Sequence, residues 1–304
     1  MDKINYTIII PHYNIPDLLM RCLKSIPLRS DVQVIVVDDC SPNANEYKHR
    51  YPELSRPFVE FYSTQHGGSA GHARNVGLKH AKGNWVIFSD SDDFFADDFS
   101  DILDEYVDND SDIIVFNSKG VQSNDISIEY NRDMRTEYFE NYEKDADDLQ
   151  FRFRCVTPWA KIIKRSFIER IGARFDETRY SNDYFFSVFT GFHAKKLLPV
   201  NRIMYIVTRR EDSLSSTCLF DSNKLSLREA KDRFLVCMKV QKFLDKNNVP
   251  LHLENYKSYA MFYLHSHRLH FILSYIGLIP KYPFLCANIL KFWLSIKQKN
   301  RKTF

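Results

Sequence analysis

Short apolar runs alternate with helically spaced apolar residues along the first 120 residues of the chain. The runs lie at Tyr6–Ile10, Val32–Val37, Phe58–Ser63, Trp85–Ser89 and Asp112–Phe116. The second run is almost continuously apolar, as in strands that are buried on both faces. Residues 17–26, 69–81 and 99–107 carry apolar side chains at the spacing of an α-helix. Strand and helix in alternation predict an α/β fold whose sheet is mostly parallel, with right-handed crossovers.

The pattern changes after residue 120. Residues 121–215 mix polar and apolar segments, with a further strand predicted at Ile203–Val207. From Asp221 onward the chain has a helical pattern. We therefore expect one α/β domain over residues 1–215 and a helical C-terminal extension over residues 216–304.

The end of this extension is rich in large apolar residues. Leu, Ile, Phe and Trp crowd the segment Phe271–Ile296, and a basic tail follows it. The segment could pack against the α/β domain, lie in a membrane interface with its tail on anionic lipid, or span the bilayer. Spanning is disfavoured by residues that interrupt the apolar run, namely Pro280, Lys281, Pro283 and Lys291. Of the other two arrangements we favour the interface.

Composition narrows the class of protein. The formal charge is only +3, which argues against binding nucleic acid through bulk electrostatics. The six cysteines are scattered and form no C-x-x-C pair, so we expect reduced thiols and a cytoplasmic location. The N-terminus lacks the basic and apolar regions of a secretory signal.

Polar clusters follow three of the predicted strands at the points where those strands end. Pro11–Asn14 follows the first strand, Asp38 and Asp39 end the second, and Asp90–Asp93 follows the fourth. The carboxyl ends of parallel strands meet at one edge of a sheet, where ligands bind. Aspartates this close repel one another, so we expect a cation there. Carboxylate oxygens suit Mg²⁺ or Mn²⁺, which leave positions open for substrate phosphates.

The residues at these strand ends also form an ordered set of motifs. T-I-I-I-P-H-Y-N, V-I-V-V-D-D-C-S-P, G-H-A-R-N-V-G-L and D-S-D-D occur in that order. Together they resemble the family 2 glycosyltransferases with the GT-A fold, closely over about the first 120 residues and more loosely over 155–190. The resemblance implies a Rossmann-like sheet flanked by helices. It also implies a nucleotide-sugar half over 1–120 and an acceptor half over 121–215.

The resemblance carries roles to individual positions. It implies that Pro11, Tyr13, Asn14 and Asp39 surround the nucleobase and ribose, and that Arg74 lies by the base and phosphates. It also implies that Asp92 is the principal metal ligand, that Asp90 approaches the ribose or the metal, and that Asp93 helps to position the sugar. Trp159 would line the acceptor site. Members of the family usually invert the anomeric carbon in one displacement, with a carboxylate as general base.

Two positions depart from the family pattern. Cys40 stands where glycine is most common after the paired aspartates, and Asn182 replaces the glutamate of a Glu-Asp pair. The aspartate of that pair is Asp183, which we expect to be the base, with Asp176 or Glu177 as competitors. A carboxylate must come within hydrogen-bond reach of the attacking hydroxyl.

These observations predict an inverting sugar transferase that depends on Mn²⁺ or Mg²⁺ and sits peripherally on the inner face of the cytoplasmic membrane. It would move a sugar from a nucleotide diphosphate donor, a UDP-hexose or UDP-N-acetylhexosamine, to a saccharide or lipid-linked saccharide in surface polysaccharide synthesis. One alternative is a catalytically degenerate nucleotide-sugar-binding or scaffold protein. The other is a nucleotidyltransferase, which would want a Gly-rich loop where this chain has P-H-Y-N.

Overall fold

The computed structural model describes residues 3–130, 134–210 and 227–251. The apolar segment Phe271–Ile296 and the basic tail, for which we expect a membrane interface, therefore lie outside the described residues. No helix within those three ranges combines the length and the apolar character that crossing a bilayer requires.

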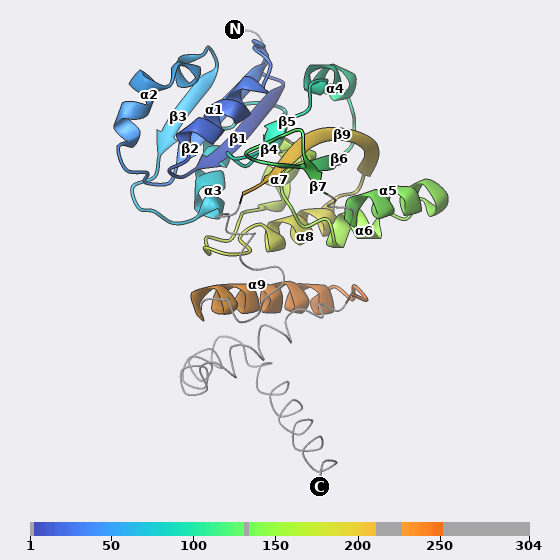
Figure 1. The fold of residues 1–304 in the computed structure, drawn as a ribbon. Helices are drawn as coiled ribbons and strands as arrows, with labels where there is room; N and C mark the ends of the chain where they lie inside the picture. The colour runs from blue at the N-terminus through green and yellow to red at the C-terminus, as the bar shows by residue number, and fades with distance from the viewer. Residues whose placement is uncertain (1–2, 131–133, 211–226, 252–304) are drawn as a thin grey trace.

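A single curved sheet forms the centre of the described part (Figure 1). Its strands are β1 Tyr6–His12, β2 Val32–Asp38, β3 Val59–Ser63, β4 Trp85–Phe88, β5 Phe94–Phe95, β6 Ile113–Gln122, β7 Glu129–Tyr130, β8 Lys161–Lys164 and β9 Leu197–Arg209. Their order is β3-β2-β1-β4-β8-β6-β9-β5, and β7 pairs with β6. Strands β1 to β4 are parallel, as the alternating pattern predicts. Beyond β4 the sheet is mixed, because β8 runs antiparallel to both β4 and β6.

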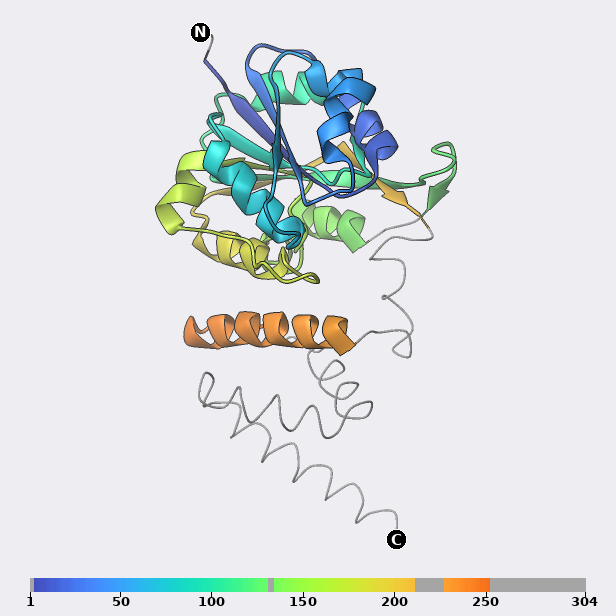
Figure 2. The same cartoon turned by 90° about the vertical axis from the view of Figure 1, so that its left-hand side faces the viewer.

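Helices cover both faces of the sheet (Figure 2). They are α1 Pro16–Lys24, α2 Tyr47–Arg50, α3 Ala70–His80, α4 Phe99–Tyr106, α5 Met134–Asp145, α6 Leu149–Phe153, α7 Arg165–Ile171, α8 Tyr184–His193 and α9 Leu227–Lys246, with single 3₁₀ turns at Ala44–Glu46 and Pro52–Ser55. The helices predicted at 17–26, 69–81 and 99–107 correspond to α1, α3 and α4.

The two-residue period of the strands divides the core between the two faces. Ile8 and Ile10 pack in one apolar cluster with residues of α1 and α4. Ile9 points to the other face and joins a second cluster with residues of α7 and α8. Strands apolar at every position are therefore buried on both sides, which explains the continuous apolar runs.

Several strand boundaries differ from the sequence prediction, and β6 runs six residues beyond the predicted end at Phe116. Strand β1 continues through Pro11 to His12, whereas the pattern ends it before the proline. The Ile9 carbonyl accepts from the Ser89 N–H, so Ile9 faces β4. Pro11, two residues later, faces the same side, but β4 has already ended there. The N–H group that proline lacks would therefore have had no strand partner. Strand β9 is also longer than the predicted run, because its first half pairs with β6.

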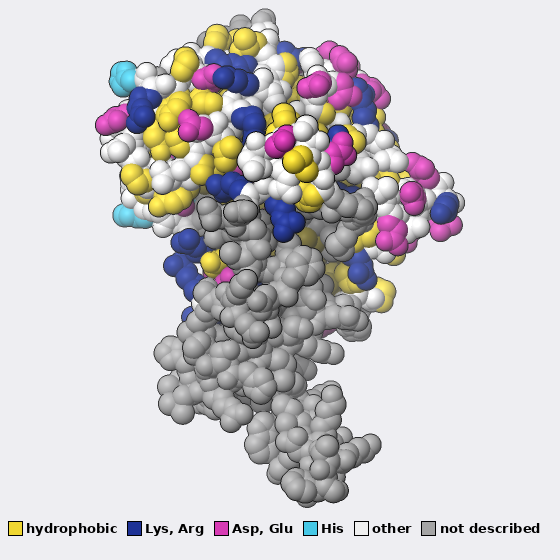
Figure 3. All heavy atoms as spheres, viewed as in Figure 1, with side chains coloured by type: hydrophobic (Ala, Val, Ile, Leu, Met, Phe, Trp, Pro, Cys, Tyr) yellow, Lys and Arg dark blue, Asp and Glu magenta, His cyan; other side chains and the backbone are white. Residues whose placement is uncertain are grey.

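The described start of the predicted C-terminal extension is the helix α9, which packs on α8. Val236, Val240 and Leu244 lie in one apolar cluster with Phe153 and Val188. Acidic and basic side chains are interspersed on the face shown in Figure 3, in keeping with the small net charge.

Candidate active site

The ends of β1, β2 and β4 lie side by side because β1 pairs in parallel with both of the other strands. Tyr6 is opposite Val32 on β2 and Trp85 on β4, so all three strands leave the sheet at the same edge. The polar clusters at their ends therefore form one rim, as the sequence predicts.

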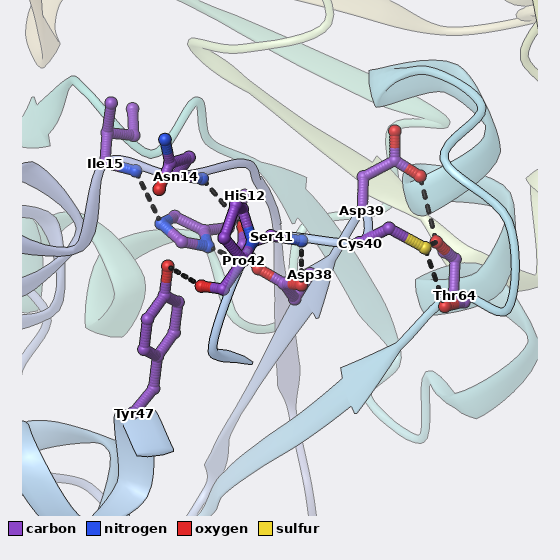
Figure 4. A network of polar contacts seen from close by, with 10 residues as sticks. All are labelled: His12, Asn14, Ile15, Asp38, Asp39, Cys40, Ser41, Pro42, Tyr47 and Thr64. Carbon is purple, nitrogen blue, oxygen red and sulfur yellow. Dashed lines mark hydrogen bonds and ion pairs between the residues drawn. The ribbon is translucent and has the colours of Figure 1, made fainter. Parts of the chain in front are cut away.

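A buried hydrogen-bond network joins the loops after β1 and β2 (Figure 4). His12 Nδ1 lies 2.8 Å from Asp38 Oδ1, and the Ile15 N–H donates to His12 Nε2 at 3.2 Å. Since Nε2 accepts, the proton of the neutral ring is on Nδ1 and faces Asp38. Ser41 donates to Asp38 through both its N–H and its hydroxyl, and its Oγ accepts from the Asn14 N–H at 2.7 Å.

The network fixes the charge of Asp38. Burial alone would raise the pKa of this carboxyl, but the hydrogen bonds from His12 and Ser41 outweigh burial and hold its pKa below the usual value. The sequence reasoning missed this pair. His12 and Asp38 are direct partners in the β1–β2 register, so aligning the two strand ends would have revealed it.

The loops that this network anchors carry the residues assigned to the nucleobase. Asn14 and Cys40 both have left-handed backbone, with φ of 51° and 64°. Tyr13 presents an exposed ring, and Pro11 remains within β1. Left-handed backbone at Cys40 is the conformation that glycine adopts most easily, which gives a physical reason for glycine at this position in the family.

Asp39 holds the turn that precedes α3. Both of its carboxylate oxygens accept from the Gly68 N–H at 3.1 Å, and one accepts from the Thr64 hydroxyl at 3.0 Å. Ser69, which follows Gly68, caps the N-terminus of α3, because its hydroxyl accepts from the His72 N–H at 3.2 Å. Asp39 therefore faces the N-terminus of the helix that carries Arg74.

Arg74 connects two parts of the rim. Its Nη2 lies 2.6 Å from Asp90 Oδ1, its Nη1 donates to Asn182 Oδ1 at 2.9 Å, and its guanidinium lies 5.3 Å from the centre of the Phe175 ring. The side chain is almost fully buried. The structure thus brings Arg74, Asp90 and the residue before Asp183 together.

The Asp-Ser-Asp-Asp turn is held by hydrogen bonds to the buried Tyr205 and Thr208 and to the half-buried Arg21. The Asp90 N–H donates to the Tyr205 hydroxyl at 2.8 Å, Arg21 donates to the Asp92 carbonyl at 2.7 Å, and Asp93 Oδ1 accepts from the Thr208 N–H at 2.7 Å. Burial raises the pKa of Asp93 well above its usual value. Asp93 is thus turned into the protein, toward the end of β9.

Asp92 lies closer to solvent than Asp93. Its Oδ2 is 3.2 Å from Arg210 Nη2. Burial and the neighbouring Asp90 raise the pKa of the Asp92 carboxyl, while Arg210 opposes the rise. The sequence reasoning did not include Arg210 or Tyr205, which come from β9 and the residue after it, more than 100 residues away along the chain.

Asp183 is the N-terminal cap residue of α8 and is partly buried. Burial raises the pKa of its carboxyl, Arg74 opposes the rise, and Asp90 adds to it. The competing carboxylates are engaged elsewhere: Asp176 pairs with Lys239, and Glu177 accepts from Asn75.

Trp159, assigned to the acceptor site, is buried. Its ring stacks on Tyr205 with centroids 5.2 Å apart, and the Arg135 guanidinium lies 4.2 Å from its centre. Through Tyr205 it supports the turn that carries Asp90.

The carboxylates of the turn suit a divalent metal that keeps positions open for substrate. Among the described residues no three His, Cys, Asp or Glu side chains gather closely enough to hold an ion by themselves. Asp90 and Asp92 would supply hard oxygen ligands, and a cation bound there would oppose the rise in the pKa of Asp92 that burial and Asp90 cause. Mg²⁺ and Mn²⁺ sites built on one or two carboxylates plus substrate phosphates fit this donor set.

Comparison with known proteins identifies the family. The family model for "Glycosyl transferase family 2" matches residues 7–172, more than half of the chain, so the chain belongs to that family. Glycosyltransferase GlyA of Streptococcus pneumoniae is 27% identical over 226 residues, which are 70% of this chain and 32% of GlyA. The poly(ribitol-phosphate) beta-N-acetylglucosaminyltransferase TarS of Staphylococcus aureus is 26% identical over 217 residues, 68% of this chain and 36% of TarS. The chain thus matches about a third of the length of these two relatives.

Solved structures show the same fold. Residues 1–349 of S. aureus TarS in complex with UDP-GlcNAc superpose with a TM-score of 0.59 and 19% identity, covering 90% of this chain and 75% of that one. The mannosyltransferase PcManGT of Pyrobaculum calidifontis in complex with GDP-Man and Mn²⁺ gives a TM-score of 0.56 with 16% identity, covering 96% and 85%. The mixed sheet flanked by helices is therefore a GT-A fold.

Proposed function

We propose that this protein is an inverting glycosyltransferase that moves a sugar from a nucleotide diphosphate donor to a hydroxyl of a saccharide or lipid-linked saccharide. The observation that carries the proposal is the contact of Arg74 with both Asp90 and Asn182, next to Asp183. It joins a carboxylate turn, a buried cation and a carboxylate of raised pKa at one rim of the sheet. The proposed transfer would use each of these groups, to hold a metal, to offset phosphate charge and to accept a proton.

The donor would lie along the rim. Tyr13, Asn14 and Asp39 would contact the nucleobase and ribose, and Arg74 would face the diphosphate. Among the similar structures, one contains UDP-GlcNAc and another GDP-Man. Two sequence relatives are a poly(ribitol-phosphate) beta-glucosyltransferase and a poly(ribitol-phosphate) beta-N-acetylglucosaminyltransferase, which favours a UDP-hexose or UDP-N-acetylhexosamine donor and a surface polysaccharide as product.

A divalent ion, Mn²⁺ or Mg²⁺, would be held by Asp92 and Asp90. When bound it would neutralise charge on the departing nucleoside diphosphate. Among similar structures, the PcManGT complex contains Mn²⁺.

Asp183 would act as the general base. The acceptor hydroxyl attacks the anomeric carbon while its proton passes to the Asp183 carboxylate. The bond between the anomeric carbon and the phosphate oxygen breaks, and the nucleoside diphosphate leaves with that electron pair. A carboxyl of raised pKa takes the proton more readily than an ordinary aspartate does.

The chain would have two parts, a catalytic domain and a C-terminal extension at the membrane surface. Residues 1–215 would form the catalytic domain, with Asp183 and Trp159 in its acceptor half. Residues 216–304 would lie at the inner face of the cytoplasmic membrane, where a lipid-linked acceptor is available.

A thermal-shift panel tests the donor site. UDP, GDP, dTDP, CMP and their common sugars are each added with and without Mn²⁺. A ligand at about one hundred times its dissociation constant raises the free energy of unfolding by about 2.7 kcal/mol. We expect metal-dependent stabilisation by one nucleoside diphosphate, and loss of it in Asp92→Asn. No response to any ligand would contradict the proposal.

Asp183→Asn separates an enzyme from a binding scaffold. The enzyme keeps the donor-induced stabilisation and loses release of nucleoside diphosphate. A scaffold shows no turnover to lose.

A further inference from the structure

The loop that leads to Asp183, residues 172–183, is held between two helices. On one side lies α3, and on the other lies α9 (Figure 1). The family model ends at residue 172, so residues 173–183 of the loop and all of α9 lie outside that match.

Helix α3 anchors the first half of the loop. Asn75 exchanges two hydrogen bonds with the backbone of Phe175, at 2.9 and 3.0 Å, and also donates to Glu177. Gly71 lets the two backbones approach, because a Cβ there would meet the Asp176 carbonyl oxygen at 2.0 Å. The Asp176 N–H donates to the Asn182 carbonyl at 3.0 Å, which folds the loop back on itself.

Helix α9 contacts the opposite side of the loop at three points. Lys239 forms an ion pair with Asp176, Asp232 accepts from the Arg179 N–H at 3.2 Å, and the Arg233 guanidinium lies 5.9 Å from the centre of the Tyr180 ring. The contacts from α3 described above lie at residues 175–177 and those from α9 lie at residues 176, 179 and 180, so both helices hold the loop at Asp176.

Lys239 also reaches past Asp183. Its Nζ lies 3.8 Å from the centre of the Phe185 ring on α8. One side chain therefore contacts the chain seven residues before Asp183 and again two residues after it. The Asp176 carboxylate is largely buried, so its ion pair with Lys239 is screened less than an exposed pair.

We propose that Lys239 is a positioning residue for the reaction: α9 sets the placement of the loop before Asp183, so the segment after the matched family domain completes the site. The inference rests on the proposed role of Asp183 as base. Lys239 acts through the loop and contributes no group to the chemistry.

Lys239→Met is the first variant to make, because it removes the charge and keeps an apolar stem over Phe185. Lys239→Arg retains the charge. Lys231→Met is the matched control, since Lys231 is an exposed lysine on the same helix. Amide hydrogen exchange is measured over residues 175–183. Turnover is measured as nucleoside diphosphate release from whichever UDP- or GDP-linked sugar most stabilises the wild-type protein.

In Lys239→Met we expect exchange of the Asp176 and Arg179 amides to rise about five- to ten-fold, with β1 and β2 unchanged. We expect turnover to fall by about the same factor while the donor concentration for half-maximal thermal shift stays the same. Lys239→Arg and Lys231→Met should behave as the wild type. Unchanged exchange in Lys239→Met, or faster exchange with full turnover, would overturn the inference.

Asp183→Asn, measured in parallel, keeps the two proposals apart. Full turnover in that variant would overturn the assignment of Asp183 as base, and the proposal that Lys239 positions the loop for that base would fall with it. Loss of turnover there, with an unaffected Lys239→Met, would overturn the positioning role alone.

Discussion

Asn182 Oδ1 accepts a 2.9 Å hydrogen bond from Nη1 of the buried Arg74 guanidinium. The Asn182 amide nitrogen donates in turn to the carbonyls of Thr178 and Arg179, at 3.3 and 3.4 Å. At this position the family pattern has a glutamate. A neutral amide here leaves Arg74 with one carboxylate partner, Asp90, so under the proposed function more of its positive charge would be available to a diphosphate.

Asn182→Ala should lower the free energy of unfolding by about 1–3 kcal/mol, because it leaves a buried guanidinium nitrogen without its acceptor. Urea unfolding measures the change. Asn124→Ala is the control, since Asn124 is exposed, and it should stay within about 0.5 kcal/mol of the wild type. A loss at Asn182 no larger than that of the control would contradict the structural role given to this hydrogen bond.

The sequence predicts the β1–β4 half of the fold well because its signals are local. Continuous apolar runs identify buried strands, and the polar residues at their ends identify the rim. The second half depends on pairing that no local pattern records: β8 enters antiparallel between β4 and β6. Tyr205 and Arg210 reach the Asp90–Asp93 turn because β9 pairs with β5, which directly follows the turn, and no local pattern records that pairing either.

Substitutions at Cys40 test whether its left-handed backbone explains why glycine is most common at this position in the family. Left-handed backbone costs an ordinary residue roughly 1–2 kcal/mol, which glycine avoids, while glycine loses about 0.5–1 kcal/mol through unfolded-state entropy. Cys40→Gly should therefore leave the free energy of unfolding within about 1 kcal/mol of the wild type. Cys40→Val should lower it by more, because branching at Cβ disfavours this conformation. Thermal or urea unfolding of Cys40→Gly and Cys40→Val measures the difference. Equal stability of the two variants would contradict the backbone strain expected at φ 64°.

Asp38→Asn should make stability less dependent on pH in acid. The folded pKa of Asp38 is lowered, so the ionised carboxylate stabilises the fold above its unfolded pKa of about 3.9, and the contribution is lost as the pH falls through the folded pKa. The variant should be less stable than the wild type by about 1–3 kcal/mol at pH 7. Urea unfolding between pH 7 and pH 3 should show this difference shrinking below about pH 4. Asp97→Asn, at an exposed site, should show no such trend.

Under the proposed function, Arg210 would compete with a metal ion for Asp92. The guanidinium lies 3.2 Å from the carboxylate oxygen, so removing it frees a ligand and a negative charge. Arg210→Met should tighten Mn²⁺ binding to the nucleotide-free protein about two- to five-fold, in line with the ~1 kcal/mol upper range for partly exposed ion pairs. Titration calorimetry measures the affinity, and Asp92→Asn in the same background should abolish the gain. Weaker Mn²⁺ binding in Arg210→Met would exclude Asp92 as the ligand.

Asp183→Asn should be more stable than the wild type at pH 7 while losing turnover. Burial raises the folded pKa of this carboxyl, so its ionised form costs stability at every pH above that pKa. The amide removes the cost, and the difference in stability should fade as the pH drops through the folded pKa toward the unfolded value of about 3.9.

Turnover of Asp183→Asn should fall about 10²- to 10⁴-fold, the usual contribution of a general base. In the wild type the acid limb of the turnover profile should lie above about pH 3.9, because only the ionised carboxylate can accept the proton. A less stable Asp183→Asn at pH 7 would contradict the buried, charge-crowded placement of this carboxylate.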